Sequence, residues 1–286
     1  MATGTAMSGT LSVGDEVQLL GTGLHSRVRS IHAQNKKVNQ AQAGQRCAIN
    51  LSGADITREH LQRGHWLVKG NTPPPQLRMD ALFRISANEV NSFRHLTPVH
   101  LHLGTGHTMA KVAVLQGVSI EPGGQGMVQL VLHEPMGAVA GDRFILRDSS
   151  AQRTIGGGLI LDVFAPAKGR SKLERLKELN LLVNTNISAS LMGLIAINPK
   201  GVWLQAFADN NNLHSNEAEA LFAKVEMRKI DTPQGQLAFS VDNWAFWCEE
   251  IKNQLLLFHQ KKPALIGPFA DITPELLLNC ANDGVL

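Results

Sequence analysis

The sequence has few cysteines and no long apolar run. Its three cysteines, Cys47, Cys248 and Cys280, are far apart and odd in number. They therefore exclude a disulfide framework and a C-x-x-C metal site, and they favour a reducing compartment. No apolar run approaches the roughly 18 to 20 residues of a membrane span. The N-terminal stretch "MATGTAMSGT" lacks the charged and apolar regions of a signal peptide. We expect a soluble, cytoplasmic protein without a membrane partner.

The sequence also lacks the short motifs of common enzymes. It contains no G-x-S-x-G, no H-E-x-x-H and no close pair of carboxylates suited to acid–base chemistry. It has no G-x-x-x-x-G-K-[ST] phosphate loop, and the glycine run of "TIGGGLIL" (154–161) is followed by no lysine and opens no helix. We expect this chain alone to catalyse no reaction and to hold no cofactor. Its glycines are expected to let a strand bend or approach a neighbour closely.

Charge of either sign is modest. Charged residues make up 18% of the 286 residues, the net charge is +3 and the isoelectric point is near 8.8. This balance permits an anionic partner without requiring one. The hydrophobic share of 43% is that of a globular protein with real cores. Because the length exceeds that of one ordinary domain, we expect several.

The N-terminal part of the chain has the pattern of β structure in two segments. Over residues 1–72, short β-rich runs are punctuated by recurrent glycines, which favours a barrel or a sandwich. The stretch "NTPPPQ" (71–76) indicates a linker, because three prolines cannot sit in a central strand. Alternating runs resume over 73–168. The prediction is two small β-barrels in succession, with the first truncated at its N-terminus.

Helical periodicity begins after residue 168. The stretch "SKLERLKELNLLV" (171–183) predicts an amphipathic helix, with Arg175 among the charged residues outside its apolar stripe. The stripe consists of Leu173, Leu176, Leu179 and Val183. A second helix is predicted over 187–197.

A helix-turn-helix pattern and a hairpin follow. Residues 201–225 predict a short strand, a short helix, a polar turn and another helix, with Asn216 as its N-cap and Glu219 as the N3 partner. Residues 227–241 predict a hairpin around "PQG". Together these elements predict a winged helix over 169–241.

The last segment, 242–286, reads as the start of a second winged helix that is cut off partway. A helix begins near Asp242, and "TPE" (273–275) marks the start of another. The chain then ends at a would-be strand, and it begins as abruptly. We expect a fragment of a longer protein.

Three histidines lie close together in "HLHLGTGH" (100–107). His100 and His102 share one face of a predicted strand, and His107 follows a short turn. No cysteine or carboxylate is near in sequence, so the ligand set of a zinc site is incomplete. Histidines that face solvent or an RNA backbone are the favoured interpretation, and no metal site is predicted.

Basic residues cluster modestly on predicted strands and loops. Solvated surface charge and the clamping of phosphates both explain single members, because arginine and lysine are mostly exposed in any protein. The groups are Arg27 and Arg29 on one strand face, Lys36 and Lys37 in a loop, and Arg143, Arg147 and Arg153 near the glycine run.

Several stretches resemble translational GTPases. "TGTAMSGTLSVGDEVQLL" (3–20) is similar to the T-G-x-x-x-x-G-x-[LV]-x-x-G-D stretch that opens the barrel of their second domain. "DRFILRDSSAQRTIGGGLILD" (142–162) resembles the closing part of their third domain. Within that superfamily, "IHAQN", "AGQR" and "RGHWL" look most like the selenocysteine-specific elongation factors of the SelB type. The winged-helix tail agrees, because elongation factor Tu ends after the second of these barrels.

The resemblance implies recognition rather than chemistry. Such factors deliver selenocysteinyl-tRNA to the ribosome at recoded UGA codons, and their terminal winged helices grip an mRNA hairpin. Their G domain, which binds GTP and Mg²⁺, and those terminal winged helices have no counterpart in this chain. The first winged helix is then a structural spacer, and we expect a monomer.

The resemblance also implies candidate site residues. Arg46, in "AGQR", matches a position of the aminoacyl pocket, where a cation suits the anionic selenolate. The usual Asp-Arg companions of that position would precede Met1. Candidates for contact with the tRNA backbone are Arg147 and Arg153, together with Arg29, Lys36 and Lys37.

Two other functions compete with this interpretation. A winged-helix DNA-binding regulator with β-barrel domains remains an alternative. Its helix at 216–226 presents Glu217, Glu219 and Glu226 but only Lys224 as a base, which suits a phosphate surface poorly. A hydrolase on a barrel scaffold lacks a nucleophile constellation.

Overall fold

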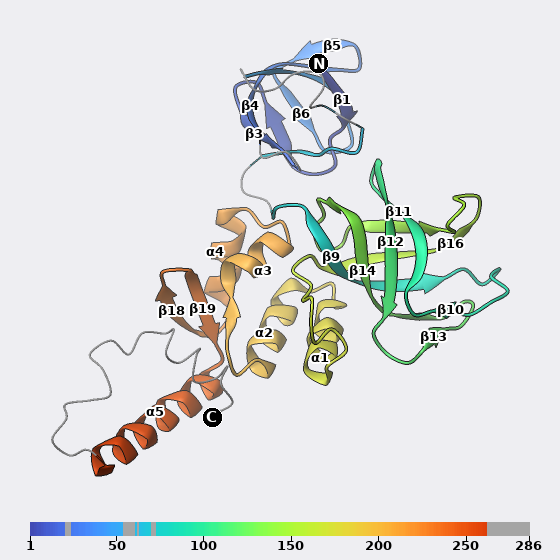
Figure 1. Cartoon of the computed structure of the whole chain (residues 1–286). Coiled ribbons are helices and arrows are strands. Elements are labelled where there is room, and N and C mark those ends of the chain that lie inside the picture. The colour runs from blue at the N-terminus through green and yellow to red at the C-terminus, as the bar shows by residue number, and fades with distance from the viewer. Residues whose placement is uncertain (21–23, 54–60, 62, 70–72, 262–286) are drawn as a thin grey trace. The chain divides into compact units, whose positions relative to one another are not determined.

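The computed structural model describes residues 1–20, 24–53, 61, 63–69 and 73–261 (Figure 1). The chain forms two compact units. The first consists of Met1–Leu179 together with Asp209–Asn212, and the second of Asn180–Ala208 and the residues from Leu213 onward. Among the described helices, none combines the length and the apolar character that crossing a bilayer requires.

The first β module is a half-barrel: an antiparallel sheet of six strands with a separate two-stranded ribbon. Its sheet runs in the order β1 (Ala2–Thr5), β7 (Arg46–Ser52), β4 (Leu24–Ala33), β3 (Glu16–Leu19) and β8 (Leu67–Val68), with β5 (Lys36–Val38) paired to β4. The ribbon joins β2 (Thr10–Ser12) to β6 (Gln40–Gln42). Alternation along the strands turns apolar side chains inward. The core they form consists of Val17, Val28, Ile31, Ala33, Ala41, Cys47 and Ile49.

The β4–β5 hairpin corrects one prediction. Lys36 and Lys37, expected in a loop, are the first two residues of β5. Gln34 and Asn35 take φ values of 51° and 60°, as in the two-residue type I′ turn that matches the twist of paired strands. Because this turn contains no glycine, the sequence lacked the usual signal for so tight a connection.

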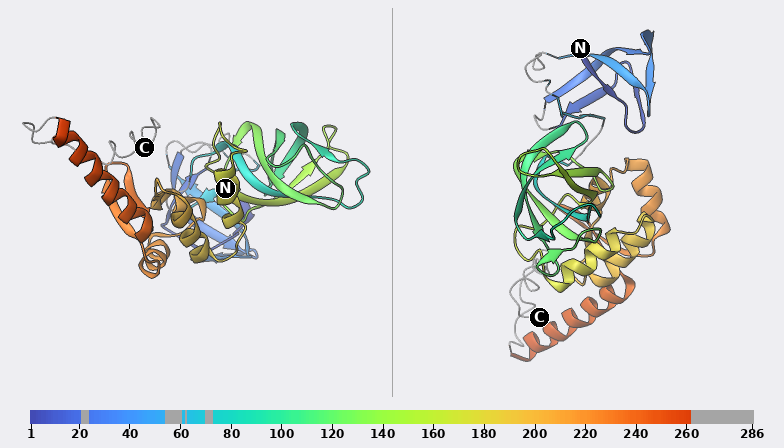
Figure 2. Two further views of the ribbon diagram at one scale, coloured as in Figure 1. Left: turned by 90° about the horizontal axis from the view of Figure 1, so that it is seen from below. Right: turned by 90° about the vertical axis from the view of Figure 1, so that its right-hand side faces the viewer.

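The second β module is a closed barrel (Figure 2). Its strands follow one another in the order β11 (Thr97–Leu103), β12 (Gly106–Val114), β14 (Gln125–Met136), β9 (Gln76–Ile85), β16 (Thr154–Asp162) and β15 (Arg143–Arg147), and β15 returns to β11. A short pair, β10 (Phe93–Arg94) with β13 (Ser119–Ile120), lies outside this ring of strands. Phe83 and Phe144 are nearly fully buried at the centre, with ring centroids 6.3 Å apart. The expected barrel fold is confirmed.

The glycine run lies in β16, between β15 and β9. A Cβ at Gly156 would meet the carbonyl oxygen of Arg84, and one at Gly158 would meet that of Leu82 and the ring of Phe144. These glycines therefore let three strands and a core ring approach closely. Their role is structural, as expected for a glycine run that is followed by no lysine and opens no helix.

The second unit holds the winged-helix elements. They are α2 (Ile187–Ile197), β17 (Val202–Trp203), α3 (Leu204–Asn210), α4 (Ser215–Lys224), β18 (Arg228–Thr232) and β19 (Gly235–Phe239), where residues 209 and 210 of α3 belong to the first unit. β19 lies between β17 and β18 in a three-stranded sheet. Leu191, Phe207 and Ala238 are among the residues of the core between helices and sheet.

Two helices in this region differ from prediction. α4 begins two residues earlier than expected, because His214 is its N-cap and donates its backbone N–H to the Glu217 carboxylate at 2.9 Å. In α1 (Leu173–Leu182) the expected apolar Leu173 is 63% exposed. Arg175, expected on the polar side, has only 12% of its side chain exposed. Hydrophobic periodicity located the helix but not the partners of its charged face.

The helix expected near Asp242 is α5 (Val241–Lys261). It begins one residue before Asp242. Asn243 holds its start by donating from Nδ2 to the carbonyl oxygen of Ile195 at 3.0 Å. The predicted helix at "TPE" and the final strand lie outside the described residues.

Candidate functional site

Arg46 lies on the outer face of the half-barrel. It opens β7, whose next residue, Cys47, points into the core, so that Arg46 and Ala48 point outward. Ala48 is the register partner of His32 in β4, and His32 is the partner of Lys37 in β5. The fold thus places Arg46, His32 and Lys37 on one face of three neighbouring strands.

The same face contains Arg29, and the carboxylate of Glu16 in the neighbouring strand β3 is paired with Arg27 at 3.0 Å. The register of β4 with β7 shifts between Val28 and Ser30, which leaves Arg29 as the extra, outward residue of a β-bulge. No Asp or Glu occurs in β1, β4, β5 or β7. Lys36 lies at the edge, on the opposite side of β5 from Lys37, although it too is exposed. We call the surface formed by Arg29, His32, Lys37 and Arg46 the half-barrel face.

A second cationic surface lies on the closed barrel. On β11 His100 and His102 alternate with buried Val99, Leu101 and Leu103, so both histidines point outward as predicted. His100 is the register partner of Arg147 in β15, and His102 that of His107 in β12. We call His100, His102, His107 and Arg147 the imidazole–arginine cluster.

This cluster contains one imidazole nitrogen and one guanidinium nitrogen without partners. The rings of His102 and His107 stack with centroids 5.6 Å apart. His102 Nε2 and Arg147 Nε are both buried, and neither has a hydrogen-bond partner among the described residues. Burial lowers the pKa of His102, and His107, Arg147 and His100 lower it further by charge. His102 is therefore neutral at neutral pH.

Arg153 points away from this cluster. It pairs with Glu89, in the segment between β9 and β10, although 58% of its own side chain stays exposed. Arg143 is at the other end of β15 from Arg147. The sequence group at 143–153 is therefore divided: Arg143 and Arg147 lie on the outer face of β15, and Arg153 is held by a carboxylate.

Asp148 shapes the turn between Arg147 and Arg153. Its Oδ1 accepts the backbone N–H groups of Gln152 at 2.8 Å and Arg153 at 3.1 Å, while Ala151 takes φ 54°. The backbone N–H of Arg153 is the largest cause that lowers the pKa of Asp148. The acidic residue after Arg147 therefore positions the loop between the two arginines.

Alanine at Asp148 is expected to loosen this turn. Without the carboxylate, amide exchange at Gln152 and Arg153 should be roughly tenfold faster, measured by hydrogen–deuterium exchange at neutral pH. Since the pKa of Asp148 is lowered on folding, the same protection should be lost in the wild type as pH falls through that lowered value. Asn at 148 keeps one acceptor oxygen and serves as the control. Unchanged exchange in the alanine variant would contradict this role.

Sequence reasoning missed a buried charge network around Arg175. Its Nη2 donates to Asp80 at 2.6 Å and also to Asp162, and its Nη1 donates to Glu178 at 3.0 Å. Gln129 donates from Nε2 to the other oxygen of Asp80 at 2.9 Å. The network joins β9, the end of β16, β14 and α1. Its partners lie up to 95 positions apart, so no local pattern signals it.

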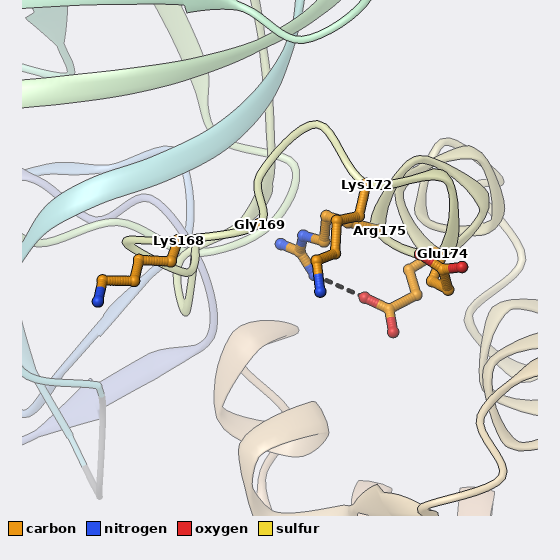
Figure 3. Close-up of a pocket in the computed structure, with 6 residues that line it drawn as sticks. Lys168, Gly169, Lys172, Glu174 and Arg175 are labelled. Atoms are coloured by element: carbon orange, nitrogen blue, oxygen red, sulfur yellow. Dashed lines mark hydrogen bonds and ion pairs between the residues drawn. The ribbon is translucent and has the colours of Figure 1, made fainter. Parts of the chain in front are cut away.

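The network lies beside a shallow hollow of about 300 Å³. Figure 3 shows Lys168, Gly169, Lys172, Glu174 and Arg175 around it, and its dashed line marks the pair between Arg175 and Glu178. Burial lowers the pKa of Arg175, but Asp162 and Asp80 raise it more, so the guanidinium stays charged. Arg175, which lines this hollow, has a structural role, and the other charged residues around it include both lysines and glutamates. In the described ranges no group of three or more His, Cys, Asp or Glu side chains could hold a metal ion.

Two protein families match the two β modules. Residues 80–167 match the family described as "Selenocysteine-specific elongation factor, beta-barrel domain". Residues 1–68 match the family described as "Elongation factor Tu domain 2". The closed barrel and the half-barrel thus each correspond to a known translation-factor module.

Curated relatives match most of the chain. The selenocysteine-specific elongation factor of Escherichia coli is 32% identical over 276 residues, which are 94% of this chain and 41% of that protein. Its counterpart from Haemophilus influenzae is 33% identical over 199 residues, 69% of this chain and 30% of that protein. This chain therefore spans less than half the length of these relatives.

A solved structure has the same fold. The crystal structure of bacterial selenocysteine-specific elongation factor EF-Sec superposes with a TM-score of 0.67 at 20% identity, over 91% of this chain and 40% of that one. At that identity the likeness concerns the arrangement of the chain.

Proposed function

We propose that this chain, which is a homologue of the selenocysteine-specific elongation factors, holds selenocysteinyl-tRNA for delivery to the ribosome at recoded UGA codons. Its two β modules bind the aminoacyl end and the acceptor and T arms. Its winged-helix unit links them to the part of the factor that grips an mRNA hairpin. Neither matched family is a G domain, so we assign GTP and Mg²⁺ to no residue of this chain.

The observation that carries this proposal is the pair of cationic faces, one on each β module. The half-barrel face presents Arg29, Lys37 and Arg46, and the closed barrel presents Arg147 on strands that also contain no Asp or Glu. Helical RNA is recognised mostly through its phosphates and 2′-hydroxyl groups, for which such faces are suited. Arg46 is assigned to the aminoacyl end, where a guanidinium stabilises an anionic selenolate.

We rank the candidate contacts to the tRNA backbone by the hydrogen bonds and ion pairs that each cation already makes within the chain. Arg147 donates one N–H to the carbonyl oxygen of Gln152 at 3.3 Å, which is a long hydrogen bond. Arg153 is paired with Glu89 and must release it to bind a phosphate. Arg29, Lys36 and Lys37 are exposed, and none makes an ion pair with any residue that the structure describes. We therefore expect Arg147 to contribute more than Arg153.

Binding of selenocysteine tRNA tests the proposal. Alanine at Arg147 is expected to weaken tRNA binding about three- to tenfold and to reduce the salt slope by about 1, whereas alanine at Arg153 should have a smaller effect. Fluorescence anisotropy over a range of salt concentrations measures both quantities. Lys177, an exposed lysine on α1, provides the matched alanine control. Equal affinity and equal salt slope for the tRNA and a random DNA duplex would refute tRNA recognition and favour the DNA-binding alternative.

A further inference from the structure

We infer that the imidazole–arginine cluster is a phosphate site coupled to proton uptake: an RNA backbone phosphate bound at Arg147 and His107 draws a proton onto His102. The affinity of this face for RNA then rises as pH falls. This inference rests on the proposed function, because it assigns a regulation to a surface already proposed to contact tRNA.

The position of His102 is the first argument. It lies in the middle strand of three, β15–β11–β12, with His107 as its partner on one side and Ile145 on the other. His100 lies two residues along the same strand, beside Arg147. An anion on this face is therefore near three imidazoles and a guanidinium at once.

The charged side chains on the three strands around His102 are all of one sign. Its own strand supplies His100, β12 supplies His107 and Lys111, and β15 supplies Arg143 and Arg147. These three strands contain no Asp or Glu. Asp148, which directly follows β15, is committed to backbone N–H groups of its own loop. No carboxylate of these strands neutralises a proton on the cluster, so a bound phosphate stabilises that proton.

Unused hydrogen-bonding capacity is the second argument. His102 Nε2 and Arg147 Nε are buried and unpartnered among the described residues, although buried polar atoms are normally paired. A neutral imidazole offers one donor, whereas a protonated one offers two. A phosphate oxygen accepts several hydrogen bonds, so protonation of His102 together with phosphate binding gives the second ring nitrogen a partner. Either step alone is less favourable, because the neighbouring cations oppose the proton and burial opposes the bare charge.

The coupling has a measurable size. Between the pKa of His102 in the free protein and its value in the complex, one proton is taken up per bound RNA. Affinity should then change by up to about tenfold per pH unit in that interval. Because the pKa of free His102 lies below the ordinary value for histidine, the affinity should go on rising as pH falls until that lowered value is passed. Histidine is the side chain whose ordinary range makes this response physiological.

The test uses the whole chain and an RNA duplex of about 12 base pairs as the probe. Its affinity is measured by fluorescence anisotropy between about pH 5.5 and 8 at constant salt. The wild type is expected to bind more tightly at low pH, and His102→Gln should lose most of that pH dependence. His25→Gln, an exposed histidine of the half-barrel strand β4, should behave as the wild type. NMR titration of the His102 ring in the wild type, with and without RNA, should show its pKa raised by the duplex, whatever the stability of the variant.

Three results would overturn the inference. They are no binding of the duplex at any pH, the same pH dependence in His102→Gln as in the wild type, or an unchanged His102 titration in the complex. Failure here is distinct from failure of the proposed function. Tight but pH-independent RNA binding would refute the proton coupling and leave the proposed function standing. A pH-dependent duplex affinity without preference for tRNA over DNA would sink tRNA recognition and keep the phosphate site.

Discussion

Methionine at Arg175 is expected to lower the free energy of unfolding of the closed barrel by about 3 to 5 kcal/mol. This is the range for breaking a buried ion pair by removing one partner. The substitution leaves Asp80, whose side chain is fully buried, and Asp162, 13% exposed, without their shared guanidinium. Burial already raises the pKa of Asp80 despite Arg175 and Gln129. An uncompensated carboxylate there carries the full desolvation penalty.

Hydrogen–deuterium exchange in β9 and β16 measures this effect, because it reports the barrel separately from the second unit. The control is methionine at Lys177, which is exposed on the same helix and should change stability by less than about 0.5 kcal/mol. A second variant, Asp80→Asn with Arg175→Met, should recover part of the loss, since it removes the buried charge together with its partner. If Arg175→Met and Lys177→Met exchanged alike in β9, the network would have no structural role.

Arg175 shows where prediction from sequence ends. Periodicity at 171–183 located the helix, because the spacing of apolar residues is a local property. It placed Arg175 outside the apolar stripe, where charged residues are usually exposed. The true partners come from β9 and β16, which the barrel topology brings to that helix. The prediction of the α4 N-cap was wrong at short range: Asn216 and Glu219 fit the capping pattern, but the His214–Glu217 pair takes that place.

For the candidate site, the sequence predicts which face of its own strand a residue lies on, but not which residues of other strands lie beside it. Strand alternation alone put His100 and His102 on one face, and the structure agrees. The pairing of His100 with Arg147, 47 residues later, depends on which strands close the barrel. Likewise Lys37, His32 and Ala48 form one row only because β5, β4 and β7 are neighbours. Long-range strand order is the information that composition and spacing do not contain.

The second large effect is expected for alanine at Gly158, which should destabilise the closed barrel by about 3 kcal/mol. The new Cβ would lie against the Leu82 carbonyl oxygen and the ring of Phe144, and forcing volume into a packed core costs about 1 to 3 kcal/mol or more. The upper end applies because the carbonyl belongs to the paired strand β9, and Phe144, only 2% exposed, has no room to turn away.

Thermal and urea unfolding of the variant measure the loss. Gly4→Ala is the control, since a Cβ there meets no heavy atom within 4 Å and should leave stability within about 0.5 kcal/mol. If Gly158→Ala were as stable as Gly4→Ala, close approach of the strands would not be what requires glycine at 158, and the run would need another explanation.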